Sequence, residues 1–60
     1  MKTIEATSQG SLDKAYERAL EIDQELRKQG HLPLYSNFIV ALDSVFIVVV
    51  YREGGFDASA

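Results

Sequence analysis

Residues that could do chemistry are few, and they gather around the end of one predicted helix. The chain of 60 residues holds one histidine, His31, and no cysteine. The dipole of a helix favours a protonated histidine just beyond its C-terminus. With nearby polar side chains, His31 predicts a polar cluster that binds a ligand or specifies a subunit interface: Tyr16, Asp23, Arg27, His31 and Tyr35.

Asp23 gives this cluster a simpler alternative. Its carboxylate falls within the apolar sector of the predicted helix, where an unpaired charge would be costly. Arg27 lies four residues further on. An ion pair along one side of the helix would therefore satisfy both charges without any ligand.

Motifs for catalysis and for metals are missing from the sequence. The serines lack the GxSxG context of a nucleophile, and no glycine-rich phosphate loop occurs. One histidine without cysteine cannot supply a structural zinc site. We expect no catalytic residue, no metal and no cofactor, and hence a protein that is not an enzyme.

Charge and hydropathy argue against two further classes of partner. Six basic and nine acidic residues give a net charge of −3. The basic residues are scattered, which argues against direct binding of nucleic acid. The longest apolar zone, residues 38–51, is interrupted by Asp43 and Ser44 and is shorter than the roughly 20 residues that span a bilayer. The N-terminus does not resemble a signal peptide. We expect a cytoplasmic protein without membrane contact.

The elements that must position these residues follow from periodicity and end signals. Residues 2–7 alternate apolar and polar types, which predicts a strand. Ser11 is a suitable N-cap for a helix over residues 12–29, which ends at Gly30. Residues 35–42 and 45–52 are rich in β-branched and aromatic types and predict a hairpin with Asp43-Ser44 at its turn. Because Asp-Ser is a weaker turn signal than Asp-Gly, the loop could also include Leu42 or Val45.

Connection rules turn this order into an α+β fold. A βαββ chain with a split crossover places the last strand in the centre of a three-stranded antiparallel sheet, with the helix packed on one face. We expect one domain over residues 1–53 and a flexible tail over residues 54–60.

The last strand is apolar on both of its faces. Val45, Ile47, Val49 and Tyr51 point one way, and Phe46, Val48 and Val50 point the other. Because one helix covers only one face, we expect self-association to cover the second. The predicted oligomer interface is Phe38, Val40, Val45, Ile47 and Val49. Folding back of the tail through Phe56, or a different protein, could cover that face instead.

The outer face of the helix carries an acidic ridge, Glu17, Glu21 and Glu25. A solvated surface explains such a ridge, and so does contact with a basic partner. Tyrosine and arginine often anchor interfaces. The predicted partner-binding residues are Glu17, Glu21, Glu25, Tyr51, Arg52 and Phe56.

These features favour a small, homo-oligomeric interaction protein that binds and modulates or inhibits another macromolecule, as accessory proteins of phages do. The same features would suit a subunit of a larger hetero-complex. The alternative class is an oligomer that binds a nucleotide or a flavin-like molecule at its subunit boundaries.

The βαββ order is similar to that of the dodecin family, which stores flavin between the sheets of a hollow oligomer. This similarity lies in the order of the elements alone. Dodecins stack flavin on a tryptophan, and this chain has none. By that resemblance, Tyr35 or Tyr51 would have to take the place of the tryptophan.

Overall fold

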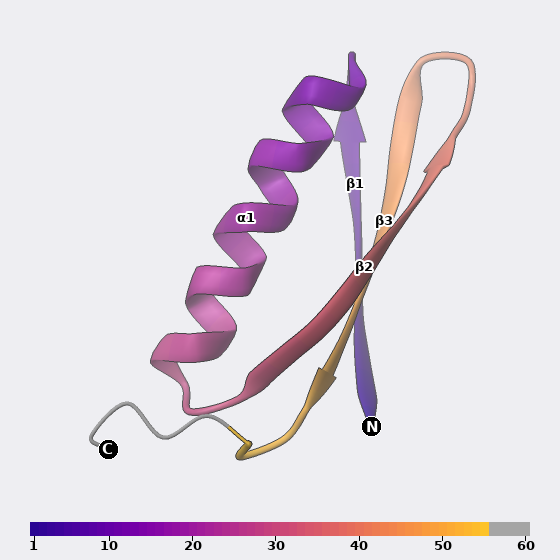
Figure 1. Cartoon of the computed structure of the whole chain (residues 1–60). Helices are drawn as coiled ribbons and strands as arrows, with labels where there is room; N and C mark the ends of the chain where they lie inside the picture. Colours follow the sequence, from indigo (N-terminus) through magenta and orange to yellow (C-terminus); the bar gives the residue numbers. More distant parts are fainter. Residues whose placement is uncertain (56–60) are drawn as a thin grey trace.

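A computed structural model, which describes residues 1–55, shows one helix and three strands in the predicted βαββ order. Their bounds are β1 Lys2–Gln9, α1 Leu12–Lys28, β2 Leu32–Val40 and β3 Ser44–Arg52. The strands form one antiparallel sheet in the order β1-β3-β2, and α1 lies against one of its faces (Figure 1). The predicted α+β fold, with the last strand central, is confirmed.

The helix α1 ends two residues before Gly30. Gly30 has φ +83°, a left-handed conformation that suits glycine. Its N–H donates to the carbonyl of Arg27 at 3.0 Å, and the N–H of His31 donates to that of Leu26 at 2.9 Å. These two bonds form a Schellman motif, which satisfies carbonyls at the C-terminus of α1 and turns the chain into β2.

The hairpin differs from its prediction in two respects. β2 begins at Leu32 and includes Pro33, which an edge strand tolerates, with a register shift between Pro33 and Tyr35. The turn includes Leu42, one of the two further loop residues that the sequence left open. Ala41 N–H donates to Ser44 O at 2.8 Å, so the central turn residues are Leu42 and Asp43. Ser44 belongs to the sheet instead, where it pairs with Gln9.

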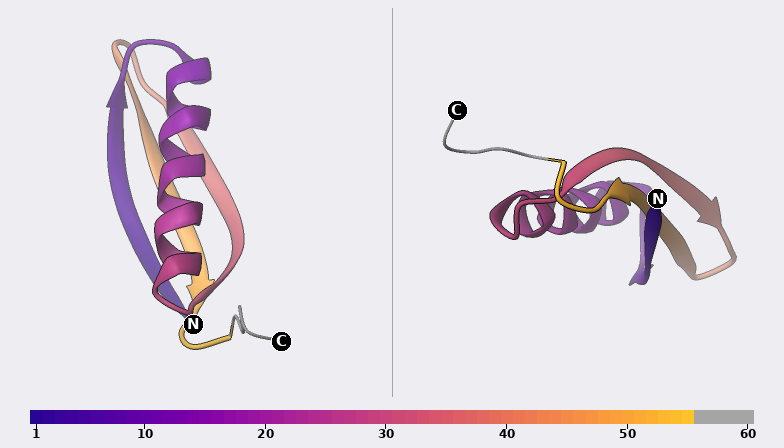
Figure 2. Two further views of the ribbon diagram at one scale, coloured as in Figure 1. Left: turned by 90° about the vertical axis from the view of Figure 1, so that its left-hand side faces the viewer. Right: turned by 90° about the horizontal axis from the view of Figure 1, so that it is seen from below.

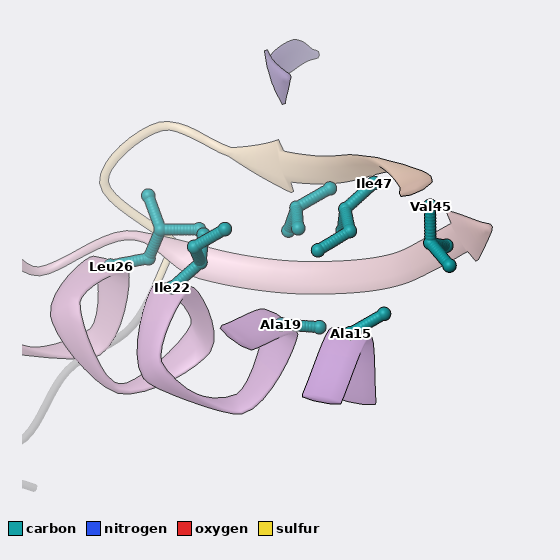
Figure 3. Packing of buried hydrophobic residues seen from close by; sticks show 7 residues of the cluster. Ala15, Ala19, Ile22, Leu26, Val45 and Ile47 are labelled. Carbon is teal, nitrogen blue, oxygen red and sulfur yellow. The ribbon is translucent and has the colours of Figure 1, made fainter. Parts of the chain in front are cut away.

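The core lies between α1 and the central strand. Ala15, Ala19, Ile22 and Leu26 point from the helix toward the sheet, where they meet Val45, Ile47 and Val49 (Figure 3). The two alanines leave room for β-branched side chains of β3 to approach the helix. Burial of these side chains is the main stabilising contribution that the fold shows.

This packing corrects the predicted oligomer interface. Val45, Ile47 and Val49 are only 1%, 0% and 1% exposed, because the helix of the same chain covers them. They are therefore unavailable to a second subunit. Alternation along β3 distinguishes two faces but does not say which of them the helix covers.

The other two residues of that predicted interface lie on the same, helix-covered face, near its open end. Phe38 is half-buried and packs against the core, whereas Val40 is exposed. Both belong to the hairpin, which diverges from α1 toward its tip (Figures 1 and 2).

Among residues 1–55, no helix is long and apolar enough to cross a membrane.

Truncation of Ile47 should be the most informative test of this core. Ile47→Ala should lower the free energy of unfolding by about 2–5 kcal/mol, and Ile47→Val by about 0.5–1.5 kcal/mol, because the larger deletion leaves a larger cavity. Urea unfolding at one fixed protein concentration measures both, since self-association would make stability depend on concentration. Equal, small losses for the two variants would contradict the assignment of Ile47 to the core.

Candidate functional site

The face of the sheet opposite the helix leaves several large apolar side chains exposed. The register places Tyr35 beside Val50 and Ile39 beside Phe46, with Val48 between these rows on β3. We name these side chains the open-face strip: Tyr35, Ile39, Phe46, Val48 and Val50. Across β3, the β1 residues of the same face are polar: Thr3, Glu5 and Thr7.

Exposure shows how much of this strip meets solvent. Phe46 is 45% exposed, Tyr35 55% and Ile39 58%, whereas Val48 is half-buried and Val50 is buried. The polar Asn37, which pairs with Val48, separates Tyr35 from Ile39 on β2. A shallow hollow of about 420 Å³ lies beside Phe46, Ile39 and Val48, bordered by Glu5 and Thr7. The surface thus combines exposed apolar side chains with a polar border along one side.

A second hollow, of about 330 Å³, lies between α1 and β1. Its lining combines apolar side chains with long charged and polar ones: Ile4, Arg18, Glu21, Ile22, Glu25, Leu26 and Gln29. Arg18 Nη1 lies 3.5 Å from Glu21 Oε2. Two members of the predicted acidic ridge, Glu21 and Glu25, therefore border this hollow, whereas Glu17 does not. All three side chains are exposed.

The predicted polar cluster is divided among separate contacts. Asp23 and Arg27 form an ion pair with Oδ1 and Nε 2.6 Å apart, so the simpler interpretation of Asp23 is confirmed. The ring of Tyr16 packs edge-on against Phe38, with centroids 4.7 Å apart. Tyr35 belongs to the open-face strip, on the opposite side of the sheet from the helix.

His31 connects the two chain ends of the hairpin. Its Nδ1 accepts a hydrogen bond from the N–H of Gly54 at 3.0 Å, and its ring lies 5.3 Å from that of Tyr51. Gly54, predicted to be part of a flexible tail, is thus bonded to the loop after α1. The role this supports for His31 is structural.

The predicted partner-binding and stacking residues are also separated. Tyr51 is half-buried on the helix side of the sheet and packs against the core, while Arg52 is exposed. Tyr35 and Tyr51 lie on opposite faces, so within one subunit they cannot stack on the same planar ligand. Phe56 lies outside the described residues.

The described part of the chain holds no group of three or more side chains that could bind a metal ion. Within residues 1–55, every buried side-chain nitrogen or oxygen of the half-buried and buried residues has a hydrogen-bond partner. The sequence pattern did not single out Ile39 and Phe46 as candidate site residues. The period-2 pattern would have found them once the helix-covered face was known.

No family model, curated protein or solved structure matches this chain. The candidate surfaces are therefore assigned from geometry and chemistry alone.

An exposed ion pair links the N-terminus to the end of β3 and makes stability depend on pH. Lys2 Nζ lies 3.1 Å from Glu53 Oε2, and this hydrogen bond and charge hold the pKa of the Glu53 carboxyl below its ordinary value of 4.5. A lowered pKa stabilises the fold above the unfolded-state value and loses that effect as the pH falls through the folded-state value.

Lys2→Ala should therefore reduce the free energy of unfolding slightly at neutral pH, because it removes this pair. The difference from the natural chain should vanish in acid, where Glu53 is protonated in both proteins. Urea unfolding across the pH series measures it. Lys28→Ala, which removes another exposed lysine, is the control and should show no change in step with the Glu53 titration. A Lys2→Ala difference that persisted in acid would contradict this account.

Proposed function

We propose that this chain is a small non-catalytic interaction protein that self-associates through the open-face strip and binds another protein through its helix layer. The observation that carries the proposal is that α1 covers one face of the sheet while Phe46, Tyr35 and Ile39 stay exposed on the other. Contiguous exposed apolar surface on a small protein marks a site of association.

The energetics favour covering this strip. Full burial of one such side chain contributes about 1.5–3 kcal/mol, and the net stability of a small domain is only about 5–15 kcal/mol. A second copy supplies a matching strip wherever the protein is present. Two-fold packing then joins strip to strip and polar border to polar border, with the sheets about 10 Å apart.

This association leaves the helices on the outside of the assembly. Glu17 and Gln24 are exposed there, and a partner with a basic surface would complement the acidic side chain. The helix layer is thus the surface that this function assigns to a foreign protein.

Ligand binding at the subunit boundary is the second candidate function. The hollow of about 420 Å³ beside Phe46 is within the range of about 300–1,000 Å³ for ligand pockets, and a second sheet would enclose it. Native mass spectrometry of the purified protein separates the two functions. A bound metabolite released on unfolding would favour the ligand, and its absence would favour the interaction protein.

Substitution of the central aromatic residue should abolish this self-association. Phe46→Lys should lower the mass of the assembly in light scattering, because the interface would have to bury a charge. Leu20→Lys is the matched control, since Leu20 is 60% exposed on the helix and lies away from the strip; its mass should equal that of the natural chain. A natural chain that is monomeric at all concentrations would contradict the proposal, as would an unchanged mass for Phe46→Lys.

Charge reversal on the helix should weaken binding of the partner. Glu17→Lys should reduce the amount of partner that co-purifies from the native cells, and added salt should reduce it for the natural chain. Gln24→Ala alters a neutral side chain in the same helix and should retain the partner. Equal recovery with both variants would remove Glu17 from the contact.

A further inference from the structure

The outer edge of β1 has backbone groups that no other described strand pairs. The N–H of Gly10, just beyond β1, donates to Asp43 O at 3.3 Å and continues the β1–β3 register. Because backbone directions alternate along a strand, the groups of even-numbered β1 residues point toward β3. Those of the odd-numbered residues point to the free edge: Thr3, Glu5, Thr7 and Gln9.

This edge has neither a proline nor a bulge, two features that often prevent pairing between strands. β1 spans eight residues with a continuous register and contains no proline. The opposite edge of the sheet, β2, carries Pro33 and a register shift next to it. Proline and irregularity are devices that block edge pairing, so the two edges differ and β1 is the one open to another strand.

The side of α1 above this edge has a charge pattern that is complementary to itself. Arg18, Glu21 and Glu25 line the hollow that Ile4 of β1 borders. Lys14 lies on the same side, since a Cβ built at Gly10 would be 3.4 Å from its Cδ. The N-terminal half of this side is therefore basic and the C-terminal half acidic, so an antiparallel copy would place opposite charges together.

We propose that β1 pairs antiparallel with β1 of a second copy, with Ala6 on the two-fold axis, to form a continuous six-stranded sheet. This register pairs residues 3–9 and sets Glu5 opposite Thr7 of the second copy. A register centred on Glu5 would oppose two glutamates, which is destabilising. Even-numbered residues form the closely spaced pairs at this new edge. The small side chain of Ala6 suits the pair that lies on the two-fold axis.

The same register brings the charges of the two helices together. Ile4 borders the hollow together with Glu21 and Glu25 of α1. Ala6 lies two residues further along β1, a displacement of about 6–7 Å. This displacement equals about four residues of α1, toward the N-terminus of the helix. The axis then passes between Arg18 and Glu21. Arg18 faces Glu21 of the second copy, and Lys14 faces Glu25 of the second copy.

Proline substitutions test the edge directly. Thr7→Pro removes an N–H that points to the free edge, so the chain should stay folded by circular dichroism while edge pairing is lost. Ala6→Pro is the contrasting variant, because it removes an N–H that bonds to β3, and it should unfold the chain. A folded Thr7→Pro variant that keeps the full mass of the natural assembly in light scattering would overturn the proposal.

Pairing through the β1 edge and packing through the open-face strip are separate proposals, and either can be wrong alone. The masses of the assemblies that the variants form distinguish them. With both interfaces, two axes that intersect at right angles generate a tetramer of 222 symmetry. Thr7→Pro and Phe46→Lys should then each give half that mass, and the double variant the mass of one chain. A natural dimer that Phe46→Lys dissociates but Thr7→Pro does not would overturn the edge and leave the strip. A natural dimer with the reverse response would support the edge alone.

Charge exchange tests the predicted register. Lys14→Glu/Arg18→Glu and Glu21→Lys/Glu25→Lys each make one side of α1 uniform in charge, and each should weaken edge pairing about tenfold or more. An equimolar mixture of the two variants should recover pairing as a mixed dimer, made visible by a mass tag on one of them. Carried out in the Phe46→Lys background, this measures the edge alone. Pairing that is indifferent to these changes would overturn the proposed register.

Discussion

The structure depends on one constraint: a single helix can cover only one face of a three-stranded sheet. β3 carries apolar side chains on both faces, and α1 covers the face of Val45, Ile47 and Val49. On the other face, Phe46 is exposed and Val48 half-buried, whereas Val50 is buried within the chain. Core and candidate interface are therefore two sides of the same central strand.

The distribution of polar residues agrees with this division. Charged side chains of the described residues form exposed pairs, such as Asp23 with Arg27 and Lys2 with Glu53. None of the described buried residues is polar or charged. The fold is therefore held by apolar contact between α1 and the sheet, while its charges are left to determine which surfaces attract one another.

The sheet edges and the helix sides differ in ways that suit pairing between copies. The edge strand β2 contains Pro33 and a register shift next to it. The other edge strand, β1, is regular and lies beneath a side of α1 that is basic in its N-terminal half and acidic in its C-terminal half. An assembly built from the open-face strip and from β1 would use one face and one edge of the sheet and leave the outer helix layer free for another protein.

Local patterns determined the helix, the βαββ order of elements along the chain and the helix end at Gly30, because each depends on residues close together in the chain. The central place of β3 also followed, from its apolar character and the rules of chain connection. Tertiary structure decided which face of β3 the helix covers, and hence that Val45, Ile47 and Val49 form the core while Phe46 and Ile39 stay exposed. It also separated the members of the predicted polar cluster: Tyr16 packs against Phe38, His31 bonds to Gly54, and Tyr35 lies on the open face. A period of two leaves both faces equivalent; only the packing of α1 across the twisted sheet makes them different.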